Sequence, residues 1–324
     1  MSVIHQGKVK VVLSDPGSQD RVIIRFTDTV TAGDGAKREV MPGKGALACD
    51  TTVFIFQYLA AKGIDTHLIS RYDEVSMLCH RVTIYPVEVV CRNIAAGSFC
   101  RRYGIERGRR LSEPLVEFFL KRDDLHDPLI APDAIVSLGL ATEEELGFMR
   151  SVTLSVNHYL SELFSLAGLV LVDFKLEFGK SSDGRILLAD EITGDSIRVW
   201  DESSSSLDKD LFREDKGDLM SAYRQLFERI RRVDSSRIEL RKEKVCVLVM
   251  SHPGIKNPPG EVAMRALKRL GLSEIREVRA GKIYELSLER PINSEMLNRI
   301  RQLNLKLLSN PIVERTRLRV GQCL

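Results

Sequence analysis

The stretch that decides the fold is LVDFKLEFG, residues 171–179, in which apolar and charged residues alternate without a break. Successive side chains of a β-strand point to opposite faces of the sheet. The stretch therefore predicts a strand that packs its aliphatic and aromatic side chains on one face. The other face carries Asp173, Lys175 and Glu177 and is available for chemistry or for contact with water.

A second strand, ILLADE at residues 186–191, follows the turn sequence SDGR. An Asp-Gly pair between two strands is the strongest short-range sign of a hairpin, because a type I′ turn needs positive φ at both central residues. With Asp183 and Gly184 as a two-residue loop, counting outward places Glu177 opposite Asp190. The sequence therefore predicts two carboxylates side by side on one sheet face.

Two carboxylates that face each other across a sheet repel, so a counter-charge is required. Either Lys175 or a bound cation could supply it. Oxygen ligands of this kind suit Mg²⁺, which takes one or two carboxylates together with substrate phosphates. A solvated amphipathic hairpin explains the same pattern equally well. Leu188 and Ile192 would also share the carboxylate face if the strand pairing continued unbroken.

The composition of the 324-residue chain is that of a globular protein, and its length predicts about two domains. The net charge is +3, with acids and bases interspersed, which gives no electrostatic footprint for nucleic acid or an anionic membrane. No apolar run is long enough to span a bilayer, and the N-terminus lacks a signal-peptide core. We therefore expect a cytoplasmic protein without nucleic-acid or membrane partners.

Two segments carry cations that suit phosphate groups. In GKVKVVL, residues 7–13, Lys8 and Lys10 project from the same side of a predicted strand and could hold nucleotide phosphates, although lysines on an edge strand often only add solubility. Arg92 follows the predicted strand 82–90 and precedes Ser98, an arrangement that suits a monophosphate. A turn with a structural arginine is the alternative interpretation.

Two loops are further candidates. Gly33-Asp34-Gly35 allows backbone N–H groups to converge on an anion, but it does not match the phosphate-loop motif. Residues 118–128 crowd acids and His126 into a loop that ends at a proline. His126 is there either as a catalytic base or as an ordinary loop histidine.

The C-terminal part restarts the pattern after a charged linker at residues 233–243. The predicted elements are a strand at 244–250, a helix at 261–270, a hairpin of strands at 275–279 and 283–288, a helix at 294–307 and a strand at 313–320. This β-α-β-β-α-β order is that of a ferredoxin-like domain. Because it carries no cluster of acid, base and nucleophile, we expect it to serve in binding or assembly.

Taken together, the segments of the N-terminal part resemble the family of phosphoribosylaminoimidazole-succinocarboxamide synthases, or SAICAR synthetases. The matching segments, in the family's order, are 7–10, 31–36, 44–45, 86–88, 92–98, 121–128, 172–179, 190–191, 198–201 and 207–210. The chain departs from the family at Ala48-Cys49, where Asn-Asn is frequent, and at Thr193-Gly194-Asp195, where Ser-Pro-Asp is more usual. Residues 244–324 resemble PurS, the small subunit of formylglycinamide ribonucleotide amidotransferase.

The resemblance implies an α+β fold, with a two-lobed domain similar to ATP-grasp enzymes and kinases at residues 1–232 and a small β-α-β-β-α-β domain at 244–324. It implies an enzyme that uses ATP and Mg²⁺ to join L-aspartate to carboxyaminoimidazole ribonucleotide through an acyl phosphate, giving SAICAR, ADP and phosphate in purine biosynthesis. The C-terminal part implies a homo-oligomer that assembles with the large and glutaminase subunits of the amidotransferase.

The resemblance also implies roles for individual residues. ATP would be bound by Lys8, Lys10, Lys121 and the backbone at Glu88 and Val89, which would meet adenine. Mg²⁺ would be held by Glu177 and Asp190. The ribonucleotide would be bound by Arg92, Ser98, Arg198 and Arg213 at its phosphate and by Asp173 at its ribose. The catalytic residues would be Lys175, Asp127 and Asp34, with Gly33 and Gly35 in a loop that closes over the aspartate.

A second hypothesis belongs to a different class. In it, the chain is an interaction protein whose C-terminal domain builds the amidotransferase assembly, while the N-terminal domain binds nucleotide without ligase activity. The Glu177 and Asp190 pair argues against this hypothesis, because a scaffold does not need a metal site. Activation of a carboxylate by phosphoryl transfer needs positioned cations and exclusion of water rather than a strong protein nucleophile.

Overall fold

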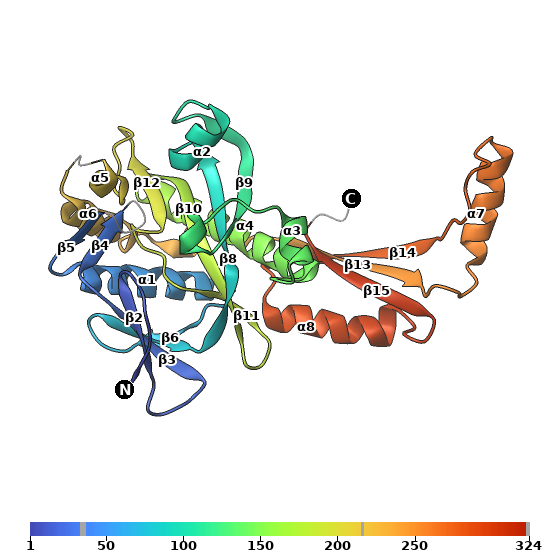
Figure 1. The fold of residues 1–324 in the computed structure, drawn as a ribbon, viewed down its shortest axis with the longest axis horizontal. Helices are drawn as coiled ribbons and strands as arrows, with labels where there is room; N and C mark the ends of the chain where they lie inside the picture. The colour runs from blue at the N-terminus through green and yellow to red at the C-terminus, as the bar shows by residue number, and fades with distance from the viewer. Residues whose placement is uncertain (33–36, 215–216, 322–324) are drawn as a thin grey trace. The chain divides into compact units, whose positions relative to one another are not determined.

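The computed structural model describes residues 1–32, 37–214 and 217–321 (Figure 1). The chain divides into two compact units, Met1–Arg241 and Lys242–Leu324. Each unit combines helices with β-sheet, so the prediction of an α+β fold is confirmed. Among the described helices, none is both long and apolar enough to cross a membrane.

The first sheet of unit 1 is antiparallel and covered by a long helix. Its strand order is β1 (Val3–Gln6), β2 (Lys10–Ser14), β3 (Arg21–Phe26), β7 (Ser76–His80) and β6 (Leu68–Arg71). Helix α1 (Lys44–Ala61) packs against β3, β6 and β7 and buries an apolar core with them. Strands β4 (Thr29–Ala32) and β5 (Lys37–Val40) form a separate two-stranded ribbon.

The second sheet of unit 1 is built around the strand that contains residues 171–179. Its order is β11 (Ile186–Ala189), β10 (Leu169–Ser181), β8 (Val82–Ile94) and β9 (Arg110–Leu120), and β12 (Ile197–Asp201) also pairs with β10. Helix α4 (Glu143–Leu166) packs against β8, β9 and β10, as Figure 1 shows. A capping box between Thr142 and Glu145 begins this helix.

The hairpin of β10 and β11 forms, but the predicted register is wrong by one residue. Glu177 pairs with Ala189 rather than with Asp190. The N–H of Ser181 donates to the carbonyl of Arg185, which leaves three residues in the loop instead of two. Gly184 has φ of 84°, the left-handed conformation that closes a three-residue hairpin loop. Asp190 follows the strand and itself has φ of 63°.

One interpretation of the alternation was that the charged face of β10 meets water, but the two acids of this face are buried. Asp173 is 6% exposed and Glu177 is 3% exposed. The apolar face, with Val172 and Phe174, is equally buried. Charged side chains buried to this extent require partners, so the face is a structured ionic site rather than a solvated surface.

Short elements and a terminal segment complete unit 1. These are α2 (Gly97–Tyr103), α3 (Pro132–Ser137), α5 (Asp210–Arg213), α6 (Leu219–Ile230) and 3₁₀ turns at Asp123–Leu125 and Ser235–Arg237. The segment predicted as a linker packs on this unit up to Arg241. Lys62 Nζ donates to the carbonyls of Ser235 and Ile238, and the Arg241 N–H donates to the hydroxyl of Tyr159.

Unit 2 contains a three-stranded antiparallel sheet in the order β14 (Gly281–Leu288), β13 (Glu243–Ser251), β15 (Glu314–Val320). Its helices are α7 (Pro258–Arg269), α8 (Ser294–Leu303) and a π-helical turn at Asn304–Leu308. The predicted strand at 275–279 is wrong, because this segment has no strand pairing. The residue that follows this segment, Ala280, exchanges two hydrogen bonds of 2.9 Å between its backbone and the side chain of Asn257.

Candidate active site

The site begins with the charged face of β10, which continues across neighbouring strands. The register places Asp173 opposite both Arg92 on β8 and Arg198 on β12. It places Glu177 opposite Glu88. The first row of the sheet, Arg92, Asp173 and Arg198, therefore alternates in charge. The second row, Glu88 and Glu177, brings two carboxylates together.

In the first row, Asp173 joins two guanidinium groups. Its Oδ2 accepts hydrogen bonds from Arg92 Nη1 at 2.9 Å and from Arg198 Nη1 at 2.5 Å. Burial raises the pKa of Asp173, and the two guanidinium groups oppose that shift. The carboxylate thus holds two cations of the same sheet face close together.

These cations line a cavity of about 320 Å³. Its lining residues are Val90, Arg92, Ser98, Asp173, Phe174, Lys175, Asp195, Ser196, Ile197, Arg198, Lys209 and Arg213. Five of them are cations and two are carboxylates, so the cavity suits an anionic ligand. The residues that the resemblance implies for the ribonucleotide, as far as the structure describes them, all lie in this lining.

A second carboxylate, that of Asp210, orients two of the cations that line the cavity. Asp210 accepts from Arg198 Nε at 2.5 Å and from Arg213 Nη1 at 2.7 Å. Asp208, which is fully buried, accepts from the backbone N–H groups of Val199 and Asp210 and ties the segment to β12. Burial, followed by the charge of Asp210, raises the pKa of Asp208 to about 7.

The second row is stabilised by lysines. Lys175 Nζ lies 2.5 Å from Glu88 Oε1 and 3.4 Å from Glu177 Oε1, and Lys121 Nζ lies 2.5 Å from Glu177 Oε1. Burial alone would raise the pKa of Glu177, but Lys175, Lys121 and Lys10 outweigh it and lower the pKa to about 2. Because Lys175 also lines the cavity, it connects the two rows.

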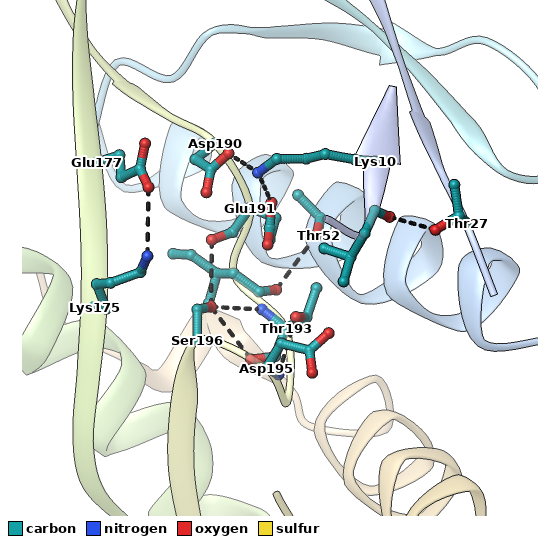
Figure 2. Close-up of polar contacts among 12 residues, drawn as sticks. Lys10, Thr27, Thr52, Lys175, Glu177, Asp190, Glu191, Thr193, Asp195 and Ser196 are labelled. Carbon is teal, nitrogen blue, oxygen red and sulfur yellow. Dashed lines mark hydrogen bonds and ion pairs between the residues drawn. The ribbon is translucent and has the colours of Figure 1, made fainter. Parts of the chain in front are cut away.

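The loop after β11 brings two more acids to this cluster (Figure 2). Lys10, at the start of β2, forms ion pairs with Asp190 and Glu191. His67 is buried, and its Nε2 lies 3.1 Å from the carbonyl oxygen of Asp190. Burial lowers the pKa of His67 to about 3, so its ring is neutral near pH 7 and supports the left-handed backbone of Asp190.

The donor set of this cluster fits a magnesium ion that takes only part of its coordination from the protein and the rest from a bound phosphate and water. Asp190 and Glu191 offer carboxylate oxygens that pair with Lys10, and the charge of Lys10 also helps to lower the pKa of Glu177. In residues 1–32, 37–214 and 217–321, no group of three or more metal-ligating side chains is arranged to hold a metal. Mg²⁺ commonly takes only one or two protein carboxylates and completes its coordination with phosphate oxygens and water.

Two other residues named from the sequence have contacts outside this cluster. Lys8 is in the turn before β2, not on the same strand as Lys10, and pairs with Asp123 at 2.9 Å. The carboxylate of Asp127 accepts from the backbone N–H of Arg122 at 2.8 Å, within its own loop. The structure thus gives Lys8 and Asp127 contacts other than those that the resemblance implies.

Two further predictions concern backbone. Glu88 and Val89 are paired on both sides, with β10 and with β9, so the ladder uses their backbone N–H and C=O groups. The contact of this backbone with adenine stays a prediction. Gly33, Asp34 and Gly35 lie outside the described residues.

Sequence reasoning missed several residues that the structure brings into the site. Lys209, Asp195 and Ser196 line the cavity. Lys44 is buried and pairs with Asp195 at 2.5 Å. Lys44 and Lys209 stand in segments that carry the family resemblance, which was the available signal, but no pattern in the sequence gave them a role.

Together, a sheet face with alternating charges, a cavity lined by cations and an adjacent cluster of carboxylates and lysines form a site that suits phosphorylated ligands. Residues 3–230 match the family described as SAICAR synthetase. Residues 244–322 match PurS, described as phosphoribosylformylglycinamidine (FGAM) synthase. The chain belongs to the SAICAR synthetase family and carries a C-terminal PurS domain.

Similar proteins agree with this assignment. The phosphoribosylaminoimidazole-succinocarboxamide synthase of Finegoldia magna is 47% identical over 232 residues, which are 71% of this chain and 100% of the relative. The synthase of Methanocaldococcus jannaschii is 44% identical over 228 residues, which are 70% of this chain and 93% of the relative. The predicted resemblance and the prediction of an enzyme of this class are confirmed.

Solved structures are similar to the same part of the chain. A SAICAR synthetase (Type-2) in complex with ADP has a TM-score of 0.68 and 41% identity, covering 70% of this chain and 96% of its own. The phosphoribosylaminoimidazole-succinocarboxamide synthase from Ehrlichia chaffeensis has a TM-score of 0.69 and 37% identity, and the match covers 72% of this chain and 99% of that structure's chain.

Proposed function

We propose that unit 1 catalyses the ATP-dependent ligation of L-aspartate to the carboxylate of carboxyaminoimidazole ribonucleotide. The observation that carries this proposal is the continuity of the cation-lined cavity with the carboxylate and lysine cluster on one sheet face, through Lys175. The relative solved with ADP supports nucleotide use. The cavity suits a phosphorylated substrate, and the cluster of carboxylates and lysines suits the phosphates of a nucleoside triphosphate.

The chemistry follows from the poor reactivity of a carboxylate. Transfer of the γ-phosphoryl group to a carboxylate oxygen gives an acyl phosphate and ADP. The amine of L-aspartate then attacks the acyl carbon, loses a proton and expels phosphate, which leaves the amide. Both steps spread charge over phosphoryl oxygens, so positioned cations and exclusion of water supply the catalysis.

The residues that line the cavity bind the ribonucleotide. Arg92, Arg198 and Arg213 bind the ribonucleotide phosphate, together with the hydroxyl of Ser98. Asp173 is already bonded to two of these guanidinium groups, so we assign it to orienting them as well as to the ribose.

At the other row, Lys175 and Lys10 are placed to neutralise charge on the transferred phosphoryl group. Glu177 and Asp190 would hold Mg²⁺, which when bound would neutralise phosphate oxygens. The low pKa of Glu177, about 2, keeps this ligand ionised across the physiological range.

A coupled assay of phosphate release tests the proposal. Release should require ATP, L-aspartate and the carboxylated ribonucleotide together, and omission of any one should abolish it. Phosphate release that continues unchanged without L-aspartate would rule out the ligase and favour the alternative, a nucleotide-binding scaffold without ligase activity.

For unit 2 we propose assembly, with itself and with the amidotransferase subunits that PurS serves. Its match to PurS and several uncovered apolar side chains support a protein-binding role; the most exposed are Leu270 at 81%, Leu307 at 79% and Ile312 at 84%. Sedimentation of the full chain alone, and mixed with purified large and glutaminase subunits, tests it. A monomer that co-sediments with neither subunit would reject the assembly role.

A further inference from the structure

Arg92 is held from both neighbouring strands. It is 4% exposed, its Nη1 donates to Asp173 on β10, and its Nε donates to Glu117 on β9 at 2.6 Å. Carboxylates on either side thus fix the plane of its guanidinium group. Arg92 and Asp173 line the cavity, but Glu117 is not among the lining residues.

Glu117 is itself shared between two cations. It is 7% exposed and pairs in the ladder with Val90, two residues before Arg92 on β8. While one oxygen accepts from Arg92, the other accepts from Nη2 of Arg102, which comes from α2. The buried carboxylate of Glu117 therefore neutralises charge on both guanidinium groups. Because Arg102 occupies its second oxygen, only one oxygen of Glu117 is bonded to Arg92.

Aromatic rings hold Arg102 in place. Its guanidinium carbon lies 4.9 Å from the ring centre of Tyr103, 5.5 Å from that of Phe119 and 6.0 Å from that of Phe99. The Arg92 guanidinium also lies 5.6 Å from the Phe99 ring, which directly follows Ser98 of the cavity lining. Contacts of cations with ring faces add attraction and restrict side-chain rotation.

We propose that Glu117 and Arg102 are positioning residues that aim Arg92 at the phosphate group of the ribonucleotide without touching the substrate. The inference rests on the proposed function, because it takes the ligand of Arg92 to be a phosphate ester. Nη1 and Nε of Arg92 are committed to Asp173 and Glu117, so their geometry decides where the remaining nitrogen, Nη2, points. A buried ion network that only stabilises the fold is the competing explanation.

Arg102→Met separates the two explanations, because methionine keeps much of the apolar contact with the rings but removes the charge. We expect KM for the ribonucleotide to rise about tenfold, the scale of one charge-assisted hydrogen bond. KM for ATP and kcat should stay within about twofold of wild type, since ground-state and transition-state binding of the phosphate weaken equally. Arg101→Met, an exposed residue of the same helix, is the matched control for loss of one positive charge.

The nucleoside that lacks the 5′-phosphate gives the decisive comparison. Its kcat/KM should be the same for wild type and Arg102→Met, because Arg92 then has no phosphate to bind. Equal losses with the nucleoside and the ribonucleotide would overturn the positioning role and leave a structural one. If Arg102→Met does not fold, Glu117→Gln takes its place, because the amide oxygen can still accept from one arginine.

Failure of the proposed function would look different. Wild-type protein would then release no phosphate with all three substrates present. Calorimetric titration of the ribonucleotide into wild type and Arg102→Met would still decide the positioning role. A roughly tenfold weaker affinity in the variant supports it, and an unchanged affinity overturns it.

Discussion

The ammonium group of Lys44 lies 2.5 Å from the carboxylate of Asp195, and both side chains are buried. Lys44 begins α1, which covers the first sheet, whereas Asp195 belongs to the loop between β11 and β12 and lines the cavity. The Asp195 carboxylate also accepts from the hydroxyl of Tyr223 on α6 at 3.0 Å. This carboxylate therefore links a helix of the first sheet, a helix near the end of unit 1 and the cavity.

Replacing Lys44 by methionine should destabilise unit 1 strongly. A buried carboxylate that loses its ion partner typically costs 3–5 kcal/mol. Asp195 keeps a second partner in Lys209, at 3.4 Å, so we expect a loss of about 3 kcal/mol, at the low end of that range, in the free energy of unfolding measured with urea. Lys180→Met is the control, because Lys180 is half exposed and its ion pair with Glu145 should contribute less than about 1 kcal/mol. Equal effects of the two changes would contradict the argument.

Glu177→Gln should remove most of the activity while the fold persists. The amide can still accept a hydrogen bond from Lys121, but it no longer offers a negative charge to a divalent cation. We expect kcat to fall about 100-fold or more, with the thermal unfolding transition still cooperative. Phosphate release and circular dichroism measure the two effects. Glu145→Gln removes another lysine-paired carboxylate outside the cavity lining and should keep kcat. A loss of structure in parallel with activity would favour a purely structural hairpin.

Alternation within residues 171–179 was enough to predict β10 and to place Asp173, Lys175 and Glu177 on one face. The hairpin followed from Asp183-Gly184, but its register did not, because the same dipeptide fits both two-residue and three-residue loops. Loop length depends on whether Ser181 or Ser182 closes the turn, and the sequence does not distinguish them. The partner of Glu177 was therefore misassigned to Asp190 instead of Ala189.

The rest of the site depends on pairing between distant strands. Glu117 reaches Arg92 only because β9 pairs with β8, and Lys209 reaches the cavity only because Asp208 ties its segment to β12. No local periodicity reports such contacts. In unit 2, residues 275–279 form no strand, and the residue that follows them, Ala280, bonds through its backbone to the side chain of Asn257. Side-chain hydrogen bonds of this kind compete with secondary structure and are invisible to patterns.

Gly194→Ala should destabilise unit 1 by displacing Tyr223. A methyl group at this position would lie 2.3 Å from Cε1 of the Tyr223 ring, well inside van der Waals contact. Overpacking of this kind typically costs 1–3 kcal/mol, and here it also threatens the hydrogen bond from Tyr223 to Asp195. Urea unfolding of the variant measures the cost.

The double variant Gly194→Ala with Tyr223→Leu provides the internal check. If the ring is the obstacle, the alanine should cost clearly less in the leucine background, because the two sites share one space. Additive costs would show that Tyr223 is not what excludes a side chain at position 194.

Asp208 should make the stability of unit 1 depend on pH in the direction opposite to that of most acids. Burial and the nearby Asp210 raise its pKa to about 7 in the folded protein, against 3.8 for the free side chain. The folded state therefore binds the proton more tightly than the unfolded state. The resulting stabilisation is complete below about pH 4 and is lost as the pH rises toward 7. The shift of roughly three units corresponds to about 4 kcal/mol at most.

Asp208→Asn isolates this contribution, because asparagine does not titrate. Its amide can accept only one of the two backbone hydrogen bonds that reach Asp208, which lowers stability by an amount independent of pH. The difference in unfolding free energy between wild type and variant should therefore fall steadily from pH 4 to pH 7 and level off above about pH 8. Urea titrations at five pH values measure it. A constant difference over that range would mean that Asp208 ionises at its ordinary pKa, and that its two backbone N–H donors stabilise the charge more than burial opposes it.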